Sequence, residues 1–101
     1  MFYNVLKAKD IVSLKDNKLD REVLMANEGS SLNIIALKKE EIIDTHTADS
    51  DAAVYVLDGE IEIHFTAEKF TLDKGEILMF KKDSEHKVLA LKDSKFFLIK
   101  I

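Results

Sequence analysis

Residues 52–65 read Ala52-Ala53-Val54-Tyr55-Val56-Leu57-Asp58-Gly59-Glu60-Ile61-Glu62-Ile63-His64-Phe65, which is two apolar segments separated by a short turn. The first segment is a continuous apolar run. In the second, apolar side chains occupy alternate positions, which places the two isoleucines and Phe65 on a buried face and Glu62 and His64 in solvent. Such alternation is typical of β-strands. The stretch therefore predicts two strands, and we interpret His64 as an ordinary surface side chain.

Similar segments recur at short intervals along the chain. They are rich in β-branched and aromatic residues, and clusters of small and polar residues separate them, because the chain has no proline and only three glycines. The expected strands are residues 21–25, 32–37, 41–45, 52–57, 61–66, 70–72, 77–80, 87–91 and 95–101. Many short strands with regular turns indicate an all-β sandwich or barrel.

Two segments depart from simple alternation. Residues 77–80 are apolar on both faces, so we expect one face to pack inside the barrel and the other against a partner subunit or the other sheet. The first twenty residues are ambiguous, since Leu14, Leu19 and Val23 could support a short helix as easily as a strand.

Length and composition limit the classes of protein. The 101 residues suffice for one core, so we expect a single domain over residues 1–101. The absence of cysteine excludes disulfides and thiolate chemistry. The net charge is −4 with both signs interspersed, so no basic stripe is present for nucleic acid. The apolar stretches are much shorter than the ~18 residues of a membrane span, and charged residues interrupt the N-terminus where a signal peptide would be apolar. We therefore expect a cytoplasmic protein with no nucleic-acid or membrane partner.

Two spaced motifs resemble those of the cupin superfamily, whose patterns are G-x5-H-x-H-x(3,4)-E-x6-G and G-x5-P-x-G-x2-H-x3-N. Counting back from Gly59 places His46 at the first histidine, and counting forward from Gly75 places His86 at the histidine of the second motif. The motifs cover about residues 41–60 and 75–90. The resemblance implies an all-β, cupin-type double-stranded β-helix, which is a jelly-roll barrel, with His46 and His86 facing each other across its interior.

The other ligand positions of these motifs are changed. Ala48 stands at the second histidine and Ala52 at the glutamate. Further departures are Lys81, Asp83 and Ala90. Metals such as Mn, Fe, Ni or Zn normally draw three or four ligands from a protein. His46 and His86 are therefore candidate metal ligands, and we expect at most a weakly bound divalent ion.

Residues in the same strand phase as the two histidines would line a pocket between them. The expected lining is Ala48, Ala52, Val54, Val56, Val88 and Ala90. An apolar wall with a few polar groups is typical of a small-molecule site. The two alanines would leave room for an organic group.

Three functions remain open. The residues favour a small-molecule-binding protein, either a sensor or binding module or a metal-independent enzyme, with no assignable reaction or catalytic residue. The first alternative is a metal-dependent enzyme of the dioxygenase or isomerase type that uses His46, His86 and waters. The second is a non-catalytic scaffold. The resemblance also implies a homodimer, which would cover apolar strand faces that a small barrel leaves exposed.

Overall fold

The structure is a computed structural model that describes residues 3–16 and 18–101. Within these ranges the chain forms one short helix, α1 (Ala8–Ile11), and nine strands. The strands are β1 (Asp20–Asn27), β2 (Ser30–Leu37), β3 (Ile42–Thr47), β4 (Ala52–Asp58), β5 (Glu60–Phe65), β6 (Lys69–Asp73), β7 (Ile77–Phe80), β8 (Glu85–Ala90) and β9 (Ser94–Lys100). Each expected strand corresponds to one of these, which confirms the all-β prediction. No helix in the described ranges is long and apolar enough to cross a bilayer.

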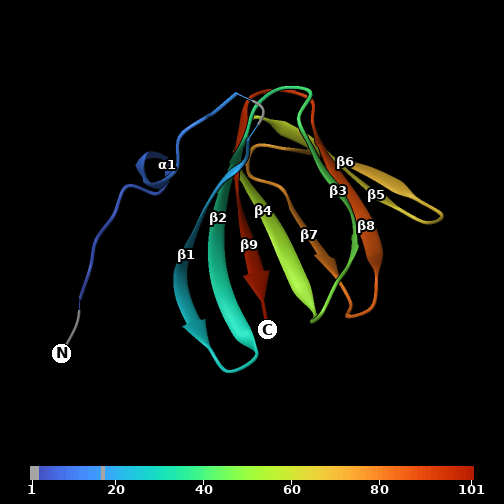
Figure 1. The fold of residues 1–101 in the computed structure, drawn as a ribbon, viewed down its shortest axis with the longest axis horizontal. Helices are drawn as coiled ribbons and strands as arrows, with labels where there is room; N and C mark the ends of the chain where they lie inside the picture. The colour runs from blue at the N-terminus through green and yellow to red at the C-terminus, as the bar shows by residue number, and fades with distance from the viewer. Residues whose placement is uncertain (1–2, 17) are drawn as a thin grey trace.

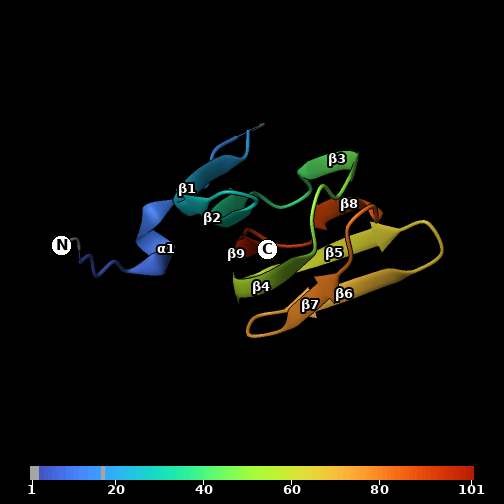
Figure 2. The same ribbon diagram turned by 90° about the horizontal axis from the view of Figure 1, so that it is seen from below.

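The strands form two antiparallel sheets that close into a jelly-roll barrel. One sheet has the order β1-β2-β9-β4-β7 and the other has the order β3-β8-β5-β6. The two sheets face each other as layers, with the five-stranded sheet continuous from β1 to β7 (Figures 1 and 2). β3 and β4 lie in different sheets, as do β7 and β8, so each motif contributes to both layers.

The core lies between the sheets and follows the predicted alternation. Ile61 and Ile63 of β5 are fully buried, and Phe65 packs partly buried against the same cluster. The other buried members of this cluster are Ile35, Leu37, Val54, Val56, Leu72, Val88, Ala90 and Phe96. They come from both sheets, so the packing of one sheet on the other is what buries them.

The N-terminal segment covers part of the outer face of the five-stranded sheet. Val12, which follows α1, is 1% exposed and packs with the outward residues Ile34 and Ala36 of β2. Figure 2 shows α1 on this outer side of the sheet. The helix ends at Ile11, before Leu14, and Val23 belongs to β1. Of the helix considered for the first twenty residues, the structure therefore contains a single turn.

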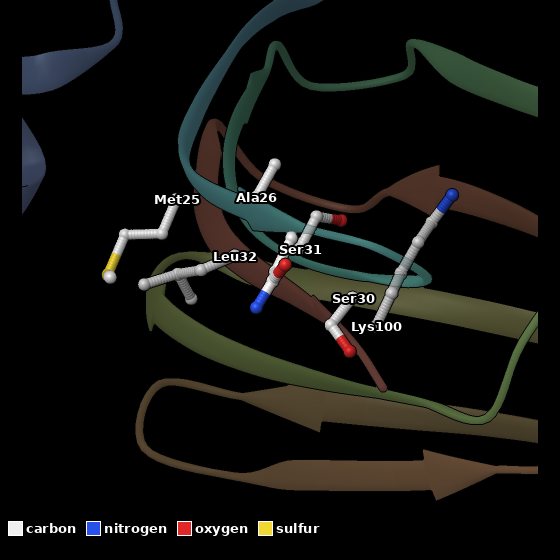
Figure 3. Close-up of a pocket in the computed structure, with 7 residues that line it drawn as sticks. Met25, Ala26, Ser30, Ser31, Leu32 and Lys100 are labelled. Carbon is white, nitrogen blue, oxygen red and sulfur yellow. The ribbon is translucent and has the colours of Figure 1, made fainter.

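The rest of the outer face is exposed in the single chain. Ile77 and Met79 of β7 are 52% and 74% exposed, so the expected burial of both faces of this strand is not found within one chain. Met79 belongs to a registered row of apolar side chains across all five strands. This outer row consists of Met25, Leu32, Ile99, Ala53 and Met79. In Figure 3, Met25 and Leu32 lie on one side of the β1–β2 hairpin and the Lys100 side chain extends toward the other.

Candidate functional site

The two candidate histidines meet at the mouth of the barrel. His46 of β3 pairs in register with His86 of β8, and their ring centroids are 4.2 Å apart at an interplanar angle of 60°. The expectation that they face each other across the interior is wrong, because β3 and β8 are adjacent strands of one sheet. A backbone carbonyl two residues earlier lies within hydrogen-bond distance of Nδ1 in each ring, at 2.9 Å for His46 and 3.1 Å for His86. Because a carbonyl oxygen only accepts, Nδ1 carries the proton of a neutral ring and Nε2 keeps its lone pair.

His86 lies in an apolar environment. The residue is 6% exposed, and the ring centroids of Phe80 and Phe65 lie 4.7 and 6.0 Å from that of His86. Burial lowers the pKa of His86. The hydrogen bond to the Ser84 carbonyl acts in the opposite direction, and electrostatic interactions with the neighbouring His46 and Lys100 lower the pKa further. The balance of these effects favours the neutral form of the His86 imidazole.

Two adjoining cavities open beside this histidine pair. One has a volume of about 70 Å³ and the other of about 100 Å³. Both are lined by Arg21, His46, Phe80, His86 and Leu98. The smaller cavity continues inward against the apolar core, and the larger one is bordered by residues 47–50 and by Lys100. The mouth of the barrel thus offers an apolar recess below a polar rim.

The structure distributes the expected pocket residues over different depths. Val54 and Val88 line the smaller cavity, and Ala48 and Ala52 line the larger one. Val56 and Ala90 lie on the same inner face but line neither cavity, because they are packed in the core at 0% and 1% exposure. Strand phase determines the face on which a side chain lies, but not its depth along the barrel. The surface assignment of His64 is only partly met, since its Nε2 lies 2.7 Å from Glu62 Oε1 and it is half-buried.

Sequence reasoning missed several polar residues at this mouth. Arg21 and Lys100 line the larger cavity, and Ser50 borders it. Asn33 supports Arg21 from β2 by accepting a hydrogen bond from its guanidinium. The sequence offered one signal for Arg21, because it is the only arginine of the chain. Its position in the site depends on strand pairing that the motifs do not contain.

These residues do not fit a dedicated metal site. No group of three or more His, Cys, Asp or Glu side chains that could hold a metal ion occurs in residues 3–16 and 18–101. The two Nε2 atoms would supply two ligands, whereas a resident transition metal normally has three or four from the protein. The missing donors are the side chains that Ala48 and Ala52 lack, and both alanines border the cavity next to the histidines.

The sequence pattern of the cupin domain matches residues 33–101, which is more than half of the chain. The chain belongs to the cupin domain family. Solved cupin-like structures agree with this barrel at low sequence identity. A conserved protein of unknown function from Streptococcus pyogenes has a TM-score of 0.90 at 20% identity, covering 100% of this chain and 89% of that one.

Two further structures support the fold. A cupin superfamily protein from Desulfitobacterium hafniense has a TM-score of 0.90 at 17% identity, with 100% and 93% coverage. A cupin 2 conserved barrel domain protein from Leptotrichia buccalis has a TM-score of 0.84 at 28% identity, covering 92% of this chain and 45% of that one. No curated protein matches the chain. The match over residues 33–101 establishes the family, and the solved structures support the barrel fold. The function has to be argued from the site.

Proposed function

We propose that this cupin binds a small organic molecule at the barrel mouth, between His46 and His86, without a resident metal. One observation carries the proposal: the two adjoining cavities share both histidines, and alanines stand at the positions where metal-binding cupins carry two further ligands. The recess is walled by Val54, Val88 and Phe80, and its polar groups are concentrated at the rim. This combination is the usual composition of a small-molecule site.

The test is a thermal-shift screen of the protein against a broad metabolite panel. A ligand at 100 times its Kd adds about 2.7 kcal/mol to the free energy of unfolding, which is a rise of about 10–20 °C in the Tm of a domain of this size. We expect a hit whose stabilisation is lost in His46→Ala and in His86→Ala. His86→Asn is the second variant at that position, because truncation of a buried ring can unfold the protein.

His64→Ala provides a matched control for this screen. His64 lies on β5 and lines neither cavity, so its removal is expected to leave the ligand response unchanged. A ligand that stabilises the wild type and both mouth variants equally would place its site elsewhere. A panel without any hit would support the scaffold alternative.

The metal-dependent alternative has less support because the described residues supply two imidazoles only. It makes a separate prediction. Restoring the missing donors with Ala48→His and Ala52→Glu is expected to raise the affinity for Zn²⁺ or Ni²⁺ by about a hundredfold or more, since additional ligands displace water from the ion. Isothermal titration calorimetry on the wild type and the double variant measures this change.

The control for the metal prediction is Ala48→His combined with Ala67→Glu. Ala67 lies in the exposed turn between β5 and β6, so a glutamate at this position adds the same charge away from the mouth. We expect the Ala48→His/Ala52→Glu variant to gain more affinity than this control, because the control restores only one of the two donors. A folded Ala48→His/Ala52→Glu protein with the same metal affinity as the wild type would contradict the assignment of these positions to the motif. Tight metal binding by the wild type, resistant to a mild chelator, would instead support the metalloenzyme alternative.

We also propose that the partner of this chain is a second copy, held through the outer row. Its members cross the whole five-stranded sheet without a charged residue, and Met25 and Met79 at the two edges are more than 70% exposed. An interface around a two-fold axis must be complementary to itself. A flat apolar row satisfies this condition because it brings no like charges together.

A further inference from the structure

Two cationic side chains reach the barrel mouth from distant parts of the chain. Arg21 is on β1 and Lys100 is at the end of β9, and both border the cavity of about 100 Å³. Among the described residues, Arg21 forms no ion pair with a carboxylate, which leaves its guanidinium available at the rim. A guanidinium is always charged and presents a planar set of donors that matches a carboxylate.

A buried amide orients Arg21. Asn33 is 0% exposed, and its Oδ1 accepts a hydrogen bond of 3.2 Å from Arg21 Nη2. The Asn33 amide nitrogen in turn donates to Ser31 Oγ at 2.9 Å and to the Leu98 carbonyl at 3.2 Å. Asn33 is therefore held on both sides by neighbouring strands. Because the Asn33 oxygen engages one guanidinium nitrogen, the other donors of Arg21 stay available for a ligand.

The second cation already has an exchangeable anionic partner. Lys100 Nζ lies 3.4 Å from Asp49 Oδ1, and the Asp49 side chain is 78% exposed. An exposed ion pair of this kind contributes little free energy, so an incoming anion can replace the Asp49 carboxylate. Ser50 beside it has a buried hydroxyl oxygen that lacks a hydrogen-bond partner within the described part of the chain. The rim therefore carries two cations and a further hydroxyl donor.

We propose that the barrel-mouth site recognises a compact carboxylate, with the acid group held by Arg21 and Lys100 and the apolar body directed past the histidines into the recess. This inference rests on the small-molecule function proposed above and names the chemical class of its ligand. The recess fits a short hydrocarbon chain, because Val54, Val88 and Phe80 line a volume of only about 70 Å³.

The test compares four probes of simple chemistry on the complete chain: butyrate, 1-butanol, butylammonium and inorganic phosphate. Chemical-shift titration by ¹H–¹⁵N NMR measures weak binding and locates it. We expect butyrate to shift the resonances of the mouth residues and to bind about tenfold or more tightly than the alcohol and the amine. Arg21→Gln should weaken butyrate binding by about ten- to a hundredfold, which corresponds to the loss of a hydrogen bond to a charged group.

Two further variants sharpen the test. Lys74→Gln removes one positive charge in the exposed turn between β6 and β7, and we expect it to leave butyrate affinity unchanged. Asp49→Asn removes the competing carboxylate, so it should strengthen butyrate binding severalfold. An equal loss of butyrate affinity in Lys74→Gln and Arg21→Gln would show that only the overall charge matters, and it would overturn the inference.

The outcomes separate this inference from the proposed function. Mouth binding of 1-butanol that is lost in His46→Ala, with no preference for butyrate, would retain a small-molecule site and overturn the carboxylate assignment. Preferred binding of phosphate would replace the carboxylate with a different anion class. Absence of any mouth response to the four probes would overturn the inference, while the metabolite screen would still decide the proposed function.

Discussion

Alanine in place of Gly59 is expected to lower the free energy of unfolding by about 4 kcal/mol, from backbone strain and overpacking together. Gly59 has a φ of +89°, a backbone conformation that is unfavourable for residues other than glycine. A Cβ atom there would also overlap the Asp93 carbonyl oxygen and the Ser94 hydroxyl. Chemical denaturation at a fixed protein concentration measures the loss, since stability of an oligomer depends on concentration.

The surroundings of Gly59 cannot easily move to accommodate this atom. Ser94 is 1% exposed, and its hydroxyl accepts a hydrogen bond of 3.0 Å from the Glu60 N–H and lies 2.7 Å from the Lys92 carbonyl, to which it can donate. These contacts join the β4–β5 turn to the start of β9. A shift at Gly59 would break the hydrogen bonds of a buried hydroxyl, which is costly.

Gly29 provides the matched control for Gly59. It also has a positive φ, of +77°, but a Cβ atom added there meets nothing within 4 Å. Gly29→Ala should therefore cost only the backbone term, about 1 kcal/mol. Equal losses in the two variants would show that the close approach at Gly59 contributes nothing to stability.

Glutamate in place of Ile99 is expected to convert the proposed dimer to a monomer. Ile99 belongs to β9, the middle strand of the five-stranded sheet, and lies at the centre of the outer row. In a two-fold interface the central residue of one copy lies near the same residue of the other, so the variant would bury two carboxylates together. The cost of burying unpaired charges is several kcal/mol, which raises the dissociation constant by more than about a hundredfold.

Light scattering at micromolar concentration measures this change. The wild type should have twice the chain mass of 11.5 kDa, and Ile99→Glu should have the mass of one chain. Ile42→Glu is the control, because Ile42 is an exposed isoleucine of β3 in the other sheet and should leave the dimer intact. A wild type with the mass of one chain would contradict the proposed partner. A dimer that persists in Ile99→Glu would place the interface on another face.

Local patterns in the sequence were sufficient for the barrel and for part of the site. Alternating side chains in residues 61–65 predicted the full burial of Ile61 and Ile63, because strand geometry repeats every two residues. The expected solvent exposure of the other face is only partly found, since the side chains of Glu62 and His64 are 17% and 31% exposed. The resemblance carried by the offsets of His46 from Gly59 and of His86 from Gly75 implied two imidazoles that face each other across the interior. The structure brings the two rings together, but as paired residues on adjacent strands of one sheet. Such spacings are informative because they count residues along adjacent strands and turns.

Other features depend on contacts between distant segments. Arg21 and Lys100 reach the same cavity because β1 and β9 both pair with β2, and nothing in either local sequence indicates that pairing. The burial of Asn33 likewise follows from its neighbours on β1 and β9. Tertiary packing alone decided that Val56 lies in the core below the cavities while Val54 lines one of them. The sequence by itself determined the strands and most of their inner faces, because these follow from local periodicity, and the histidine pair was implied by the resemblance to cupins. The depth of the pocket and its cationic rim required the closed barrel, since they arise only where strands far apart in the chain are brought together.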